Sequence, residues 1–226
     1  MQNEKRRKRP SSDAKKHPSV RESYHHGELV AALVKQGRLL LEESGIGELS
    51  LRETARRVGV SQTAPLHYFD SKAGLLAAIA SVGFQELTDL RRKSSHKIPD
   101  LRARLREHIK EYVKFAIANP GLFQLMFGPT LDRSEHPDLA RLALESYAVF
   151  ASDVEQFVLN ANWPKKYTAL ATATAWSVEH GLANLIISHQ IPMPMAPISH
   201  TVMISIATDV LLNGLDLRFA ALDKRK

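Results

Sequence analysis

The chain has 226 residues, 44% of them hydrophobic, which is enough to bury a substantial core in one large domain or two small ones. Its formal net charge of +7 favours an anionic partner such as nucleic acid or a membrane surface. The lack of cysteine excludes disulfide frameworks, thiolate metal sites and cysteine nucleophiles. No apolar run reaches the roughly 18 residues that a membrane span needs, so the sequence predicts a soluble, cytoplasmic protein with no membrane partner.

The first predicted segment is a basic arm, residues 1–22. Residues 1–25 carry eight basic and three acidic side chains, with Pro10 and Pro18 in the run and almost nothing apolar to bury. This composition predicts disorder in isolation. The arm has two interpretations: a solvating tail, or a flexible contact to phosphates or the minor groove of DNA.

Two amphipathic helices follow the arm. Residues 28–44 place apolar side chains on one face at helical spacing, up to Gly45. Residues 51–58 form a second, shorter helix, with Ser50 as its N-cap and Glu53 at the capping-box position.

A glycine turn leads from the second helix to a third. Gly59 can take the positive φ of a sharp turn, Val60 can fill the space between helices, and Ser61 is expected to cap the third helix. Helix, short glycine turn and helix is the helix-turn-helix pattern, whose second member enters the major groove.

The third helix is expected to carry a polar outer face. Leu66 and Phe69 recur at i and i+3 and are predicted to face inward, while Pro65 lies near the first turn, where few backbone donors are needed. The side chains left to point outward can bond base edges and phosphates: Gln62, Thr63, His67 and Tyr68. A further helix restarts at Asp70 and Ser71.

The remaining two thirds of the chain is predicted to be helical throughout. Proline and glycine separate periodic apolar runs, and no run alternates with period two, so the fold class is all-α. The expected helices span about 73–93, 101–118, 120–127, 137–160, 165–189 and 198–221.

Two stretches resemble a known family. The run "LSLRETARRVGVSQTAPLHYFDSKAGLL", preceded by "YHHGELVAALVKQGRLLLEESG", resembles the DNA-binding domain of TetR-family transcriptional regulators over about 50 residues. Downstream, "NPGLFQLMFG" and "WSVEHG" resemble the C-terminal domain of the subgroup named for its Trp, His and Gly, here Trp176, His180 and Gly181.

The resemblance implies an all-helical homodimer that binds double-stranded DNA and a small-molecule effector. The DNA-binding domain would span residues 23–74, and residues 75–226 would hold the ligand pocket and the dimer interface. The two long helices at 165–189 and 198–221, with small residues such as Ala169, Ala171, Ala173, Ala175 and Ala207, are expected to dimerise.

The resemblance also assigns DNA contacts, position by position. Gln62 and Arg52 are the candidates for reading bases, because amide and guanidinium groups pair bidentately with adenine and guanine. Tyr68 and Lys72 resemble phosphate contacts, with the helix start beside Lys72 adding anion affinity. Leu66 departs from the family pattern, where many members have a tyrosine that contacts the DNA backbone. The full predicted set is Tyr24, His25, Arg52, Ser61, Gln62, Thr63, His67, Tyr68 and Lys72.

Candidate pocket residues lie in the C-terminal half. Trp176 and His180, four apart, share a helix face; either they line a ligand cavity, or Trp176 fills core and His180 bonds a neighbouring helix. Phe123, Met126 and Phe127 fall on a short helix between two prolines, with core packing and a pocket or gating role as the alternatives.

Other charged groups suggest no site. The basic run from Arg91 to Arg106 is interpreted as a solvated face partly paired with Glu107 and Asp100, the alternative being a second anionic contact. The histidines lack the spacing of a metal site, no cofactor motif is present, and no catalytic motif is found, so neither a metal, a cofactor nor an enzyme is expected.

These observations predict a ligand-responsive transcriptional regulator, a repressor that binds a pseudo-palindromic operator as a dimer and is released by a small molecule. Two alternatives remain open. One is an architectural DNA-binding protein without ligand control, and the other is a helical-bundle enzyme that has kept a relic DNA-binding domain.

Overall fold

A computed structural model of the chain describes residues 20–192 and 197–223, and in this part all regular structure is helical. The side chains of residues 20–26, 220, 222 and 223 lie outside the description. The α-helices are α1 (Val20–Glu48), α2 (Leu51–Val58), α3 (Lys72–Lys97), α4 (Leu101–Ala118), α5 (Pro120–Phe127), α6 (Pro137–Asn160), α7 (Thr168–Ile187) and α8 (His200–Asp223). Three short 3₁₀ helices join them: η1 (Ala64–His67), η2 (Arg133–Glu135) and η3 (Lys165–Tyr167).

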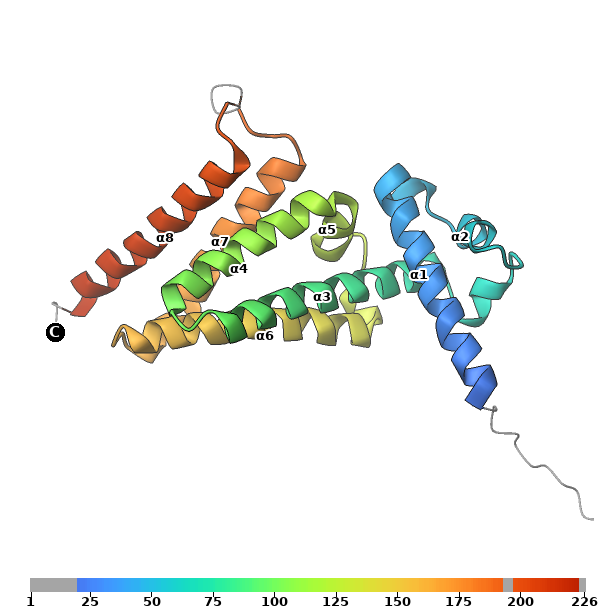
Figure 1. Ribbon diagram of the computed structural model, residues 1–226, viewed down its shortest axis with the longest axis horizontal. Coiled ribbons are helices and arrows are strands. Elements are labelled where there is room, and N and C mark those ends of the chain that lie inside the picture. The colour runs from blue at the N-terminus through green and yellow to red at the C-terminus, as the bar shows by residue number, and fades with distance from the viewer. Residues whose placement is uncertain (1–19, 193–196, 224–226) are drawn as a thin grey trace, which may run out of the picture.

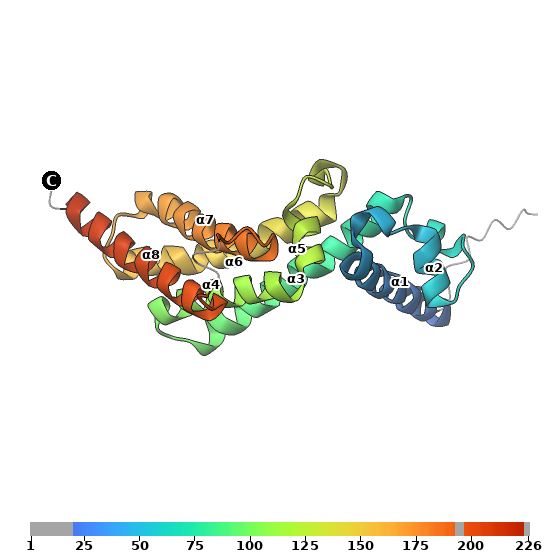
Figure 2. The same ribbon diagram turned by 90° about the horizontal axis from the view of Figure 1, so that it is seen from above.

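The molecule is elongated, with a small helical unit at one end (Figure 1). This unit consists of α1, α2 and η1, and α3 leads from it into the larger body, where it runs beside α6. Helices α7 and α8 lie at the opposite end, and the view from above keeps the same order (Figure 2). The predicted all-α class is confirmed for the described residues.

One apolar core runs through both units because α3 belongs to both. At its start, Leu75 and Ile79 pack with Leu33 and Leu41 of α1, and farther along Leu87 packs into the larger body. Burial of this face, at about 25 cal/mol per Å² of apolar surface, is the main stabilising term.

Two glycines allow close helix contacts. A Cβ added to Gly37 of α1 would lie 2.8 Å from Cδ1 of Ile79, and one added to Gly83 of α3 would lie 2.5 Å from Sδ of Met126. Both distances are shorter than van der Waals contact, so α1 and α5 pack against α3 with a closeness that larger side chains would not permit.

Most of the observed α-helix bounds agree with the sequence pattern to within a few residues, with one difference at the N-terminal end. Residues 1–19 of the predicted arm lie outside the described residues, while α1 already begins at Val20, inside the range given to the arm. The backbone of α1 breaks at Gly45, which takes φ 76° as the predicted helix end requires.

Candidate functional site

Caps at both ends fix the bounds of α2, and the second cap builds the turn that follows it. At the start of α2, the Ser50 hydroxyl accepts a hydrogen bond from the N–H of Glu53 at 3.1 Å, as predicted. At its end, Gly59 takes φ 82° and ψ 28°, and both Gly59 and Val60 donate their N–H groups to the carbonyl of Ala55. The chain therefore reverses sharply within two residues.

The segment after this turn is a 3₁₀ helix, so the prediction that Ser61 caps a third α-helix is wrong. The N–H of Ala64 donates to the Ser61 carbonyl at 3.0 Å, and the Ser61 hydroxyl lies 3.3 Å from that of Thr63 instead of capping an N–H. An α-helix would need the N–H of Pro65 to reach the Ser61 carbonyl, and proline has none. The tighter i→i+3 pattern avoids that missing bond.

Leu66 was predicted to face inward, and this is also wrong. Its side chain is 54% exposed, whereas Pro65 and Phe69 are buried. The short helix ends at His67, and Tyr68 takes φ −122° and ψ −30°, so helical spacing does not relate Leu66 to Phe69. Leu66 instead forms part of the outer surface of this segment.

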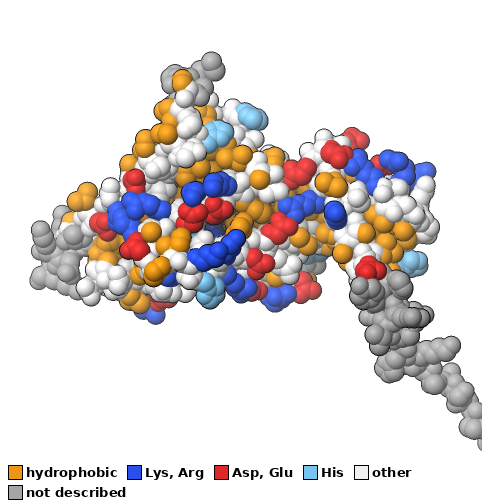
Figure 3. Space-filling model, in the orientation of Figure 1, with side chains coloured by type: hydrophobic (Ala, Val, Ile, Leu, Met, Phe, Trp, Pro, Cys, Tyr) orange, Lys and Arg blue, Asp and Glu red, His pale blue; other side chains and the backbone are white. Residues whose placement is uncertain are grey.

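Five of the predicted DNA contacts are exposed on the helix-turn-helix unit: Arg52, Ser61, Gln62, Thr63 and His67. Arg52 forms no ion pair with any other described residue. Arg56, by contrast, bonds the Glu53 carboxylate at 2.6 Å and holds the pKa of Glu53 well below its usual range, at about 2. Figure 3 shows basic side chains gathered over α2 at this end of the molecule.

The other predicted DNA contacts differ in their surroundings. Tyr68 is half-buried against the core. The ammonium of Lys72 donates to the carbonyls of Ile46 at 2.6 Å and Gly47 at 3.2 Å, so it holds the end of α1. The side chains of Tyr24 and His25 lie outside the described residues, and their role stays a prediction.

A cavity of about 560 Å³ that opens to the surface lies in the larger body, lined by helices α3 to α7 and the segment after α5. Of the predicted pocket residues, Phe127, Trp176 and His180 line it, whereas Phe123 and Met126 do not and are buried in the core. Its size lies within the range of small-molecule pockets. The full lining comprises Phe84, Leu87, Arg91, Tyr112, Phe127, Gly128, Leu131, Arg133, Ala140, Ala143, Leu144, Ser146, Tyr147, Trp176 and His180.

The sequence left two alternatives for Trp176 and His180, a place in the cavity wall or a structural role in the core. Both residues line the cavity, and His180 also bonds a neighbouring helix. Trp176 is 39% exposed, and its ring packs edge to face against that of Tyr147, with the ring centres 6.2 Å apart. It therefore lies at the mouth of the cavity and does not fill the core. Nδ1 of His180 lies 2.8 Å from the hydroxyl of Tyr112 on α4, a bond to a neighbouring helix. Burial lowers the pKa of His180 and favours its neutral form at the cavity wall.

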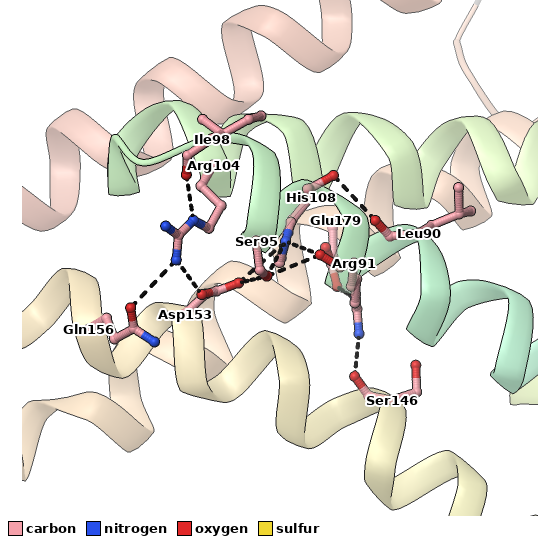
Figure 4. Close-up of polar contacts among 11 residues, drawn as sticks. Leu90, Arg91, Ser95, Ile98, Arg104, His108, Ser146, Asp153, Gln156 and Glu179 are labelled. Atoms are coloured by element: carbon pink, nitrogen blue, oxygen red, sulfur yellow. Dashed lines mark hydrogen bonds and ion pairs between the residues drawn. The ribbon is translucent and has the colours of Figure 1, made fainter.

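A buried ion pair behind the cavity wall corrects the solvated-face interpretation for Arg91. Arg91 is 5% exposed, and its Nη2 donates to the fully buried carboxylate of Glu179 at 2.6 Å (Figure 4). Its Nη1 donates to the Ser146 carbonyl at 3.0 Å, and its guanidinium lies 4.8 Å from the centre of the Phe150 ring. Burial raises the pKa of Glu179 to about 7, although the positive charge of Arg91 acts to lower it.

A second buried cluster continues this network toward the far end of α6. Arg104 bonds the Asp153 carboxylate at 2.8 Å, and Ser95 bonds the same carboxylate (Figure 4). Nε2 of His108 donates to the Arg91 carbonyl at 3.1 Å, and burial lowers the pKa of His108 to about 4. Acidic partners more than 45 residues away neutralise these arginines, a pairing that no local sequence signal reveals.

Helix α5 connects the cavity to the helix-turn-helix unit. The Glu42 carboxylate of α1 accepts from the N–H groups of Gly121 at 2.9 Å and Leu122 at 2.8 Å, in the first turn of α5. The last residue of α5, Phe127, lines the cavity. Arg38 of α1 adds a bond to Oδ1 of Asn119 at 2.8 Å, so one end of α5 is held by α1 and the other forms the cavity wall.

Comparison with known protein families identifies both units. Residues 33–79 match the model of bacterial regulatory proteins of the tetR family, and residues 105–207 match the model of the tetracyclin repressor-like C-terminal domain. Together the matches span about two thirds of the chain. The chain belongs to the TetR family. It therefore has a TetR-family regulator fold, with an N-terminal helix-turn-helix DNA-binding domain and a C-terminal domain of the ligand-binding type, while the resemblance to the Trp-His-Gly subgroup stays a prediction.

Solved structures share this fold. A protein of unknown function from Rhodococcus sp. RHA1 is 26% identical, with a TM-score of 0.74 over 84% of this chain and 97% of that one. The TetR-family regulator PfmR from Thermus thermophilus is 18% identical, with a TM-score of 0.61 over 80% and 97%. A TetR variant from Acinetobacter baumannii AYE in complex with minocycline is 17% identical, with a TM-score of 0.57 over 84% and 97%. No curated protein sequence matches the chain.

Within the described residues, no helix is long and apolar enough to cross a membrane, and no group of histidine and acidic side chains is arranged to hold a metal ion.

Proposed function

We propose that the protein is a ligand-responsive repressor that binds a pseudo-palindromic operator as a dimer and is released by a small molecule in the cavity. The observation that carries this proposal is the position of α5. It forms part of the cavity wall at Phe127, and it begins on the carboxylate of Glu42 in the helix-turn-helix unit. A change in the cavity is thereby connected to the DNA-binding end of the chain.

DNA reading is assigned to the exposed surface of α2 and η1. Gln62 and Arg52 read bases, Ser61, Thr63 and His67 contact base edges or phosphates, and the turn geometry holds them outward. Because Lys72 already bonds two carbonyls of α1, it contributes to phosphate binding mainly by positioning this end of the unit. The exposed Leu66 offers an apolar contact instead of a hydrogen bond.

Dimerisation is assigned to one exposed face each of α7 and α8. On α8, Val202, Ile206, Val210 and Leu217 are exposed and, at about 100° per residue, fall within one sector of roughly 80°. On α7, Leu170 and Leu185 are exposed on the same face as Gly181. Apolar stripes on two adjacent helices are typical of a four-helix interface between two copies.

Release follows from linkage between the two sites. A dimer whose recognition elements are about 34 Å apart fits successive major grooves on one face of DNA. A ligand that favours a different spacing weakens DNA binding by the same factor as DNA weakens ligand binding. A ligand indifferent to the spacing has no effect.

The architectural alternative would bind DNA through the basic arm with steep salt dependence and little sequence preference. The enzyme alternative would require turnover of a substrate in the cavity. The α5 connection favours the ligand-controlled regulator over both, because neither alternative needs the cavity to communicate with α1.

The proposal is tested with Gly181→Leu. A Cβ at Gly181 meets nothing within 4 Å in the chain, so the substitution is compatible with the fold while it places a bulky side chain at the proposed helix crossing. We expect wild type to sediment as a dimer and the variant as a monomer that loses retention on duplex DNA at physiological salt. Gln85→Leu, on an exposed position of α3, is the matched control and should behave as wild type. A monomeric wild type, or full DNA retention by a monomeric variant, would refute dimeric binding.

A further inference from the structure

The cavity combines aromatic walls with two guanidinium groups, and among the described residues no carboxylate lines it. Phe84, Tyr112, Phe127, Tyr147 and Trp176 supply the aromatic surface. The mouth is marked by side chains that are partly exposed, Tyr147 at 40% and Trp176 at 39%. The charges around this surface decide the chemical class of the ligand that the proposed function requires.

Arg133 provides a positive charge that nothing in the described protein neutralises. Its Nη2 donates to the carbonyl of Met126 at 2.6 Å, and its guanidinium lies 5.3 Å from the centre of the Phe84 ring. Neither contact removes charge, and no described carboxylate forms an ion pair with it. Stacking on Phe84 and the bond to Met126 hold the planar group at the cavity, where its other N–H groups can bind a carboxylate bidentately.

Arg91 differs from Arg133 because its guanidinium already bonds a carboxyl group of the protein. The Glu179 carboxylate, fully buried behind the wall and absent from the lining, bonds Nη2 of Arg91. Nε of Arg91 and the Ser146 hydroxyl are buried and have no partner among the described residues. This end of the cavity therefore offers hydrogen-bond donors to a neutral acceptor, while the guanidinium of Arg91 already bonds the Glu179 carboxyl group.

The two ends are well separated. Phe84, beneath Arg133, and Arg91 are seven residues apart on α3, which corresponds to about 10 Å along the helix axis. The apolar surface between them accommodates a flat or chain-like body of that length.

We propose that the cavity binds an organic acid whose carboxylate pairs with Arg133 and whose apolar body lies against the aromatic wall. The inference rests on the proposed function only for the effect of this acid on DNA. Cationic compounds, which aromatic walls can also bind through cation–π contacts, are disfavoured because Arg133 repels them and no carboxylate in the described part of the chain lines the cavity to attract them.

Three probes with one apolar body test the charge preference by calorimetry at about pH 7: 4-phenylbutanoate, 4-phenylbutanol and 4-phenylbutylamine. Wild type should bind the acid at least tenfold more tightly than the alcohol, and the amine most weakly, since a charge-assisted pair adds to a common apolar contribution. In Arg133→Gln the affinity for the acid should fall to within about twofold of the affinity for the alcohol, while the affinity for the alcohol stays unchanged. Arg141→Gln makes the same change of charge on an exposed α6 arginine that pairs with Asp138 and lies outside the cavity lining, and it should keep the preference for the acid.

Several results would overturn the inference: equal affinity for the three probes, preference for the amine, unchanged preference in Arg133→Gln, or no binding of the acid. Retention on duplex DNA, measured separately, distinguishes this failure from failure of the proposed function. Acid binding with the expected preference but no effect on DNA would uphold the ligand class and contradict release. Release of DNA by the alcohol or the amine without acid binding would uphold release by a small molecule and contradict the ligand class.

Discussion

Replacing Glu42 by alanine should uncouple the cavity from DNA binding while leaving both units folded. The wild-type carboxylate accepts from two N–H groups in the first turn of α5, at 2.9 and 2.8 Å. Hydrogen bonds to a charged group contribute about 1.5–3 kcal/mol each, and half-burial places these near the lower value. The negative charge at a helix start adds about 0.3–1 kcal/mol. Allowing for water replacing part of these bonds, we expect unfolding to cost about 2 kcal/mol less in the variant.

The same contact sets the size of the functional effect. Coupling free energies between sites are typically about 1–3 kcal/mol, so the loss of an anchor worth about 2 kcal/mol can remove most of the ligand response. The assay is fluorescence anisotropy of labelled operator DNA, with and without a compound that releases wild type. Glu42→Ala should bind DNA within a few-fold of wild type and respond to the compound at least fivefold less. Glu48→Ala, an exposed glutamate at the end of α1, is the control. A full ligand response in a folded Glu42→Ala variant would refute coupling through α5.

The remaining predictions concern base reading and the buried ion pair. Gln62→Ala should cost about 1–3 kcal/mol of operator binding and relax preference at one base pair in each half-site, as measured by competition with single-base operator variants; an unchanged preference would remove Gln62 from the base-reading set. Burial raises the pKa of Glu179 from 4.5 to about 7, so the folded protein holds this proton more tightly than the unfolded chain does. That group therefore stabilises the fold most below about pH 4.5, and its contribution declines as the pH rises to about 7. Denaturant titrations should show the stability of wild type falling relative to Glu179→Gln by on the order of 2–3 kcal/mol between about pH 4.5 and 8, and a constant difference would contradict the raised pKa.

The helices could be predicted from the sequence because their signals are local. Apolar residues at helical spacing, Ser50 as a cap and Gly59 at positive φ depend only on neighbours within a turn or two. The prolines at positions 120 and 137 begin α5 and α6, where a missing N–H costs nothing.

The errors came where local and tertiary effects compete. Pro65 turned the expected α-helix into a 3₁₀ helix, and that change of period exposed Leu66. Arg91 was assigned to a solvated run because its partner, Glu179, lies 88 residues farther along the chain. Arg133 was not recognised at all, since it belongs to the short 3₁₀ helix η2, whose position depends on α5 and α6 packing against α3.

Sequencing of duplexes selected from a random pool by the wild-type protein, at physiological salt, tests whether the protein reads a specific DNA sequence as a dimer. We expect a motif with two-fold symmetry, whose half-sites are centred about one helical turn of DNA apart. Recovery of duplexes without any shared motif would contradict sequence-specific reading by a dimer and favour an architectural role.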